Sequence, residues 1–144
     1  MSYRLLPVSP SMIPDAWRHV LPLLKPAIDR THGLYAPEDV YRACCEARQQ
    51  LWAVLQKETL GPLRGAVVTE VVDYPRARAL WIAFAGGTGL DAVTGAMERL
   101  EAFAREQGCS LIRAEGRRGW LRAAGFEDGG AVLYKTLTHQ ENRA

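Results

Sequence analysis

The sequence predicts a single α/β domain, built from one mixed, mostly antiparallel sheet with helices on both faces. Three observations lead to this fold class. Two apolar, strand-like runs flank the turn segment TLGPL, which is typical of an antiparallel hairpin. A strand, a long amphipathic helix and a second strand follow over residues 78–116, and such a unit forms a right-handed parallel crossover. The 144 residues suffice for one hydrophobic core, and no linker or repeat divides them.

The N-terminal segment predicts an edge strand and then a helix. Residues 3–8, YRLLPV, are apolar and closed by prolines, as edge strands often are. Residues 12–31 space their apolar side chains at helical intervals. Pro22 and Pro26 fall inside this pattern, so we expect a kinked or broken helix.

A second helix and the hairpin come next. Residues 37–50 predict a helix, because Pro37 suits its first turn and Asp39 suits its positive end. Residues 51–61 and 63–75 are the two strands of the hairpin. The loop between the two predicted helices contains His32, which we interpret as an exposed loop histidine that lies near the mouth of a site.

The strand RALWIAFAGG, residues 78–87, is apolar at every position of its middle part. Strict alternation assigns the side chains to two faces: Trp81, Ala83 and Ala85 on one, and Leu80, Ile82 and Phe84 on the other. Because both faces are apolar, we expect a central strand covered on both sides.

The crossover helix is predicted over residues 89–107. Its buried stripe consists of Leu90, Val93, Met97, Leu100 and Ala104. Thr88 and Asp91 resemble a capping box at its start, and Gly108 predicts its end.

The C-terminal part predicts a strand at 110–116, a short helix at 118–126 and a last strand at 131–137. The final stretch THQENRA is polar, and residues 136–144 are expected to form a frayed tail.

This order of elements, with two local stretches, resembles the GNAT acetyltransferase superfamily. The first stretch is WIAFAGGTGLDAVTGAMERLEAFAREQGCS, a strand, a glycine loop and a helix. The second is GWLRAAGFEDGGAVLYKTL, which resembles the family's short helix that ends in Gly-Phe, here Gly125 and Phe126. A narrower resemblance is to small GNAT-like proteins of tailed phages. The resemblance implies an acetyl-CoA-dependent N-acetyltransferase that acts on an unidentified amine.

The resemblance places the cofactor at the end of the central strand. The strand backbone would hold the pantetheine and thioester, and the glycine loop and helix start would bind the pyrophosphate. The residues concerned are Ile82, Phe84, Ala85, Gly86, Gly87, Thr88, Gly89 and Leu90. Gly89 matches a required glycine of the family. Gly86 replaces the expected Arg or Gln, and Asp91 replaces the last glycine, so the loop could equally be a plain turn.

The catalytic candidates are Glu70 as the base and Tyr134 as a proton-bearing group on the last predicted strand. Members of the family often place a tyrosine as the acid four residues before the glycine of Gly-Phe, and here that position is Leu121. Asp73 and Glu115 are further carboxylates that could act as a base. Each of these residues also has a plain structural interpretation, as a core tyrosine, a solvent-facing carboxylate or an ion pair.

Composition excludes several other classes of function. A net charge of +2 is too small to indicate a polyanion partner. The three histidines show no metal-ligand spacing with the cysteines, so no metal is expected. The odd number of cysteines favours free thiols and a cytoplasmic location, and no apolar run is long enough to span a membrane.

Two rival functions stay open beside the enzyme. The departures in the loop and at Leu121 favour a catalytically inactive module that binds another protein, such as a phage structural or accessory protein. The arginines 113, 117, 118 and 122 could instead meet an acidic partner or nucleic acid, although a solvated face explains them better. The acceptor could be a small molecule or a protein, and a homodimer stays open.

Overall fold

The computed structural model describes residues 3–56, 63–87, 90–115 and 125–138, with the backbone alone over residues 90–96. Its elements are β1 (Tyr3–Val8), η1 (Pro10–Met12), α1 (Ile13–Asp29), α2 (Pro37–Cys45), β2 (Gln50–Gln56), β3 (Gly65–Asp73), β4 (Arg78–Gly87), α3 (Leu90–Glu106) and β5 (Leu111–Ala114). The strands form one sheet in the order β1-β2-β3-β4-β5. Neighbours are antiparallel up to β4, and β5 lies parallel to β4. The predicted mixed, mostly antiparallel sheet is confirmed.

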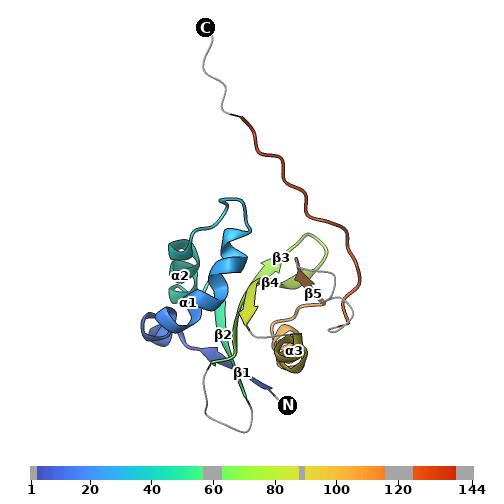
Figure 1. The fold of residues 1–144 in the computed structure, drawn as a ribbon. Helices are drawn as coiled ribbons and strands as arrows, with labels where there is room; N and C mark the ends of the chain where they lie inside the picture. Colours follow the sequence, from blue (N-terminus) through green and yellow to red (C-terminus); the bar gives the residue numbers. More distant parts are fainter. Residues whose placement is uncertain (1–2, 57–62, 88–89, 116–124, 139–144) are drawn as a thin grey trace.

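Helices cover both faces of this sheet, as predicted. Figure 1 shows α1 and α2 on one side and α3 on the other. Each side encloses its own hydrophobic core. We call the cluster that contains Leu24 and Phe84 the α1 core. The cluster that contains Ile82 and Leu100 is the α3 core. The predicted edge strand at residues 3–8 and the predicted hairpin are also confirmed.

The α3 core is closed by Met97, Leu100 and Ala104, three members of the predicted stripe. The side chains of Leu90 and Val93 lie outside the described part of the chain. Inside this core, Trp52 donates from Nε1 to Oγ1 of Thr69 at 2.9 Å, so the one polar atom of a buried ring is satisfied.

Helix α3 ends at Gly108, as predicted. Gly108 has a φ of 78°, and the amide of Cys109 bonds to the carbonyl of Ala104 at 2.8 Å. Together with the bond from Gly108 N–H to Arg105, this is a Schellman motif. The chain is thereby turned directly into β5.

Helix α1 is continuous from Ile13 to Asp29, so the prediction of a broken helix was wrong. Pro22 and Pro26 both lie on the exposed side, one turn apart. The carbonyls that lose their helical donors therefore face water, which satisfies them. Val20, Leu24 and Ile28 on the opposite side are buried in the α1 core, and this packing outweighs the local preference.

Helix α2 begins at Pro37 as predicted, but it ends at Cys45 rather than at residue 50. Ala47 has a φ of 61°, and the amide of Arg48 bonds to the carbonyl of Ala43 at 2.9 Å. This is again a left-handed C-terminal cap, here formed without a glycine. It releases the chain early enough for Gln50 to begin β2.

The C-terminal segment differs most from prediction. Residues 126–138 contain no helix or strand, so the strand predicted at 131–137 is not formed. Figure 1 shows them as an extended arm that runs away from the sheet. The predicted helix at 118–126 lies mostly outside the described residues. We refer to residues 126–138 as the C-terminal arm.

Candidate functional site

Strand β4 contains a bulge at Ala83. Val68 of β3 pairs with Phe84, whereas the next residue, Thr69, pairs with Ile82, so Ala83 is an extra residue on β4. The bulge reverses the facing of all later side chains. Leu80 and Ile82 point into the α3 core, but Phe84 belongs to the α1 core. The strict alternation predicted for residues 80–85 is therefore wrong beyond Ile82.

The second half of β4 has an open edge in the described chain. Strand β5 pairs with β4 only from Ala79 to Ile82 and ends at Ala114. No described strand pairs with that side of residues 83–87. The backbone of Ala85, predicted to contact a cofactor, thus lies beyond the last residue of β4 that pairs with β5. The bulge and the end of this pairing occur at the same point of the strand.

Gly86 and Gly87 are required by close packing. A side chain at Gly86 would collide with the carbonyl oxygen of Leu23 in α1, and one at Gly87 would collide with that of Arg64. Gly87 also has a φ of 148°, which L side chains rarely adopt. These contacts fix the end of β4 against its neighbours, whether or not a ligand binds there.

Helix α3 starts three residues after Gly87, at Leu90. The first amides of a helix have no helical acceptor and carry a partial positive charge. Thr88 and Gly89, and the side chains of Leu90 and Asp91, lie outside the described residues. The described members of the predicted cofactor set follow one another along β4, but the bulge turns the side chains of Ile82 and Phe84 to opposite faces of the sheet.

The predicted base, Glu70, lies on β3, which pairs with the edge of β4 that faces away from β5. It pairs across the strands with Trp81, one residue before Ile82. Gln49 Nε2 donates to Oε1 of Glu70 at 2.8 Å. Among the described ion pairs none involves Glu70. The carboxylate thus lies on the α1 side of the sheet, held by an amide rather than neutralised by a cation.

Two polar atoms near Glu70 lack partners within the described residues. They are Oε1 of Gln49, a residue only 3% exposed, and Nε1 of Trp81. Buried polar atoms normally form hydrogen bonds. An acceptor and a donor are therefore left unused beside one carboxylate.

Tyr35, in the loop between α1 and α2, was missed by sequence reasoning. Its ring lies 5.3 Å from that of Phe84 and 6.3 Å from that of Trp81. Burial raises the pKa of its hydroxyl above 10.0, and the charges of Glu70, Glu115 and Asp39 raise it further. Its position in a loop that returns over the sheet was the one available hint.

The structure does not place Tyr134 on a strand beside β4. It lies in the C-terminal arm and stacks on His32, with ring centroids 4.2 Å apart. The other carboxylate candidates are ion-paired: Asp73 with Arg78 at 2.7 Å, and Glu115 with Arg113 at 3.2 Å. Leu121 and the remaining arginines of the basic cluster lie outside the described residues.

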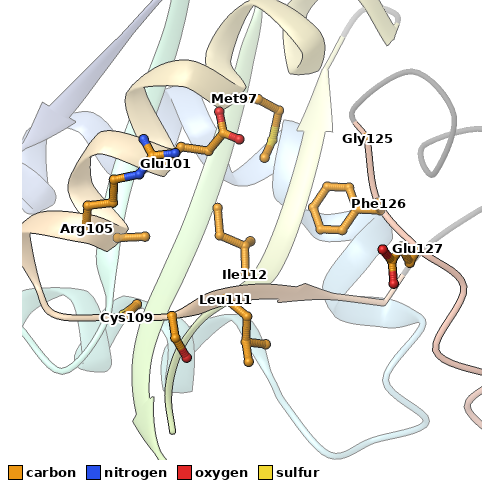
Figure 2. Close-up of a pocket in the computed structure, with 11 residues that line it drawn as sticks. Met97, Glu101, Arg105, Cys109, Leu111, Ile112, Gly125, Phe126 and Glu127 are labelled. Carbon is orange, nitrogen blue, oxygen red and sulfur yellow. The ribbon is translucent and has the colours of Figure 1, made fainter.

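A groove that the sequence did not predict lies between α3 and β5. Its volume is about 430 Å³, and Met97, Ile112 and Phe126 line it together with polar residues. Figure 2 shows Met97, Glu101 and Arg105 along the helix, and Phe126 at the C-terminal end of β5. This groove is on the α3 side of the sheet, opposite Glu70.

Other site classes are not seen in the described part. It holds no group of three side chains suited to a metal ion. None of its helices has both the length and the apolar character needed to cross a membrane. The three cysteines are free thiols, and Cys44 is buried.

Comparison with known proteins then adds one decisive finding. No family model and no curated protein matches the chain. An aminoglycoside acetyltransferase, meta-AAC0020, from an uncultured soil metagenomic sample and solved with sisomicin, superposes with a TM-score of 0.67. It is 12% identical and covers 94% of this chain and 97% of its own. The chain has an acetyltransferase fold.

Further solved structures agree with this fold. A probable acetyltransferase superposes with a TM-score of 0.63 at 12% identity, over 96% of this chain and 99% of that one. TTHA1254 from Thermus thermophilus does so with a TM-score of 0.57 at 15% identity, over 96% and 99%. At such identity the match shows the acetyltransferase fold alone.

Proposed function

We propose that this protein is a GNAT-type N-acetyltransferase that uses acetyl-CoA to acetylate an amine. The observation that carries the proposal is the end of the described pairing between β4 and β5 at Ile82, directly before the Ala83 bulge. An extended chain with amide groups, such as pantetheine, could pair with the free backbone edge of residues 83–87 as a strand would.

The start of α3 supports the same orientation of the cofactor. A pyrophosphate near Leu90 would meet unpaired helix amides and the positive end of the dipole. Gly86 and Gly87 have packing roles of their own, so they support this orientation less than the position of the helix does.

Acetyl-CoA would supply an activated thioester, and the chain would supply the proton transfers. Glu70 would take a proton from the attacking amine. Amides at the bulge would stabilise the charge that develops on the carbonyl oxygen. We assign the proton donor for the leaving thiolate to Tyr35 rather than to Tyr134, since the ring of Tyr35 lies against Phe84 and Trp81 of β4 and Tyr134 lies in the C-terminal arm.

The acceptor is proposed to be a cationic amine with a neighbouring hydroxyl. The ammonium group would face Glu70 and Oε1 of Gln49, and the hydroxyl would accept from Nε1 of Trp81. The aminoglycoside acetyltransferase solved with sisomicin gives a first compound to test. We propose that the protein acts in a reducing compartment such as the cytoplasm, and its three free thiols support this location.

Calorimetric titration with acetyl-CoA tests the cofactor, and chromatographic detection of released CoA tests the transfer. Glu70→Gln should keep cofactor binding and lose about 10²–10⁴-fold in rate. The matched control is Glu106→Gln, which removes an exposed carboxylate at the far end of α3. Absence of binding at millimolar acetyl-CoA would refute the proposal that the protein is an acetyl-CoA-dependent enzyme.

A non-catalytic protein-binding module is the second candidate. It is favoured by the packing roles of Gly86 and Gly87 and by the exposed C-terminal arm. In that case acetyl-CoA would produce no heat, and the arm would be the surface to study.

A further inference from the structure

The C-terminal arm exposes apolar side chains that a soluble chain normally covers. Leu133 is 88% exposed and Leu137 is 83% exposed, whereas Val132 and Tyr134 are 47% and 43% exposed. The values alternate with a period of two, as in a strand with one face against a surface. The arm therefore has an inner face and an outer face.

The inner face contacts the arm's own molecule at Tyr134. Tyr134 stacks on His32 in the loop before α2, with an angle of 24° between the rings. The outer face carries Leu133, Lys135 and Leu137, because these share one parity along an extended chain. Nothing in the described residues covers Leu133 or Leu137.

A surface that matches this outer face exists on the same protein. In the described chain β5 is hydrogen-bonded only to β4, so its outer edge is free. Leu111 on this edge is 48% exposed, and beside it lies the groove of about 430 Å³ between α3 and β5. Met97 and Ile112 make the groove apolar inside. A free edge beside an apolar groove is a site for an added strand.

The charges at the groove agree with the same match. Its lining includes Glu101 and Arg105 of α3 and Glu127 at the start of the same copy's arm, so one negative charge is in excess. Lys135 lies between Leu133 and Leu137 on the outer face of the arm. An arm laid along the groove would bring this ammonium group toward that excess.

We propose that the chain forms a two-fold dimer in which the arm of each copy lies along β5 of the other. Leu133 and Leu137 would fill the groove, and the arm would add a strand to the free edge. A second copy is the occupant that keeps the stack of Tyr134 on His32, since the arm need not turn back toward its own β5. Reciprocal exchange also covers both arms and both grooves at once, as closed symmetry requires.

Sedimentation velocity of the full chain tests the dimer. We expect twice the chain mass of 16.0 kDa, and a twofold drop in mass for the double variant Leu133→Asp/Leu137→Asp. Met12→Asp removes a side chain that is 52% exposed outside the groove and should leave the dimer intact. Circular dichroism of the monomeric variant should show an unchanged fold, because both leucines are exposed.

Cross-linking then identifies the contact. Cys109 lines the groove, so mild oxidation of Leu137→Cys should give a disulfide-linked dimer on a non-reducing gel. The band should vanish when Cys109→Ser is added, and Met12→Cys should not produce it. A monomer at every concentration, a dimer that the leucine variants leave intact, or a disulfide within one chain would each overturn the proposal.

Discussion

Gln49 and Glu70 are joined by a hydrogen bond of 2.8 Å, from Nε2 of the amide to Oε1 of the carboxylate. Gln49 lies in the turn before β2, and Glu70 lies on β3, so the bond fixes a turn to the sheet. Hydrogen bonds to a charged group are among the stronger ones in proteins. This pair therefore orients the one carboxylate that we assign to the reaction.

The first prediction concerns the strength of this pair. Gln49→Leu should destabilise the protein by about 1–3 kcal/mol, because it leaves a half-buried carboxylate without its donor. In a double-mutant cycle with Glu70→Leu, the two changes should couple by about 0.5–3 kcal/mol. Urea unfolding of the four proteins measures this coupling. Strict additivity would mean that the bond contributes nothing.

The second prediction concerns Tyr35, whose pKa is raised first by burial and then by Glu70. Glu70→Gln should lower the pKa of this phenol, since a negative charge nearby is lost. Glu38→Gln, at a carboxylate that is not among the causes, should leave it in place. The chain has five tyrosines, so ring signals assigned by Tyr35→Phe are followed by NMR.

The sign of the stability effect follows from the same shift. The folded pKa lies above the unfolded value of 10.0, so the native state holds this proton longer. The stability that Tyr35 contributes is complete below pH 10 and is lost as the pH rises through the folded pKa. Glu70→Gln should lower the folded pKa of Tyr35, and so narrow the pH range between its unfolded and folded pKa values over which this stability is lost. If the pKa of Tyr35 were the same in Glu70→Gln as in the unchanged protein, the charge of Glu70 would have no effect on this phenol.

The third prediction concerns the contact between Gly86 and the carbonyl of Leu23. Gly86→Ala should cost about 1–3 kcal/mol of stability, because backbone of α1 or β4 must move to admit the methyl group. Gly129→Ala is the matched control, since an added Cβ there meets nothing within 4 Å. Equal urea midpoints for the two variants would contradict the packing.

The fourth prediction concerns Cys44. Burial raises the pKa of this thiol to about 12 from 9.0, and the neighbouring Cys45 adds to the shift. Its contribution to stability is therefore complete below pH 9 and is lost as the pH rises toward 12. At pH 8 a thiol reagent should modify the half-buried Cys45 and Cys109 well before Cys44. Equal rates for all three thiols in the folded protein would rule this out.

Much of the fold could be predicted because local pattern and tertiary structure agree. The hairpin and the crossover helix have a clear period, defined ends and, at Gly108, a suitable stop residue. In helix α1 local pattern and tertiary structure disagree. Its two internal prolines disfavour a helix, but the packing of its buried side chains stabilises one. Ala47 is similar, because alanine gives no sign of a left-handed cap.

The candidate site was predictable only in part. Glu70 and the end of β4 could be proposed from the resemblance, because they lie in runs with a recognisable order of elements. Gln49, Tyr35 and Trp81 come together through the return of a loop and the pairing of strands. Such contacts depend on how strands that are far apart in sequence pair with one another. The spacing of residues within one segment does not reveal this pairing register. The same limit explains why the exposed arm was taken for a strand.

The bulge at Ala83 has one more consequence. Side chains along a strand repeat every two residues, so a single inserted residue inverts the phase of everything after it. β4 therefore consists of two half-strands whose side chains alternate in opposite phase. An even-numbered residue of the first half, Ile82, packs in the α3 core, and an even-numbered residue of the second half, Phe84, packs in the α1 core. Deleting Ala83 would exchange the sides of the second half that face the α1 core and the α3 core. A chain that keeps this architecture should therefore tolerate many exchanges of one apolar residue for another in β4, but no change in its length.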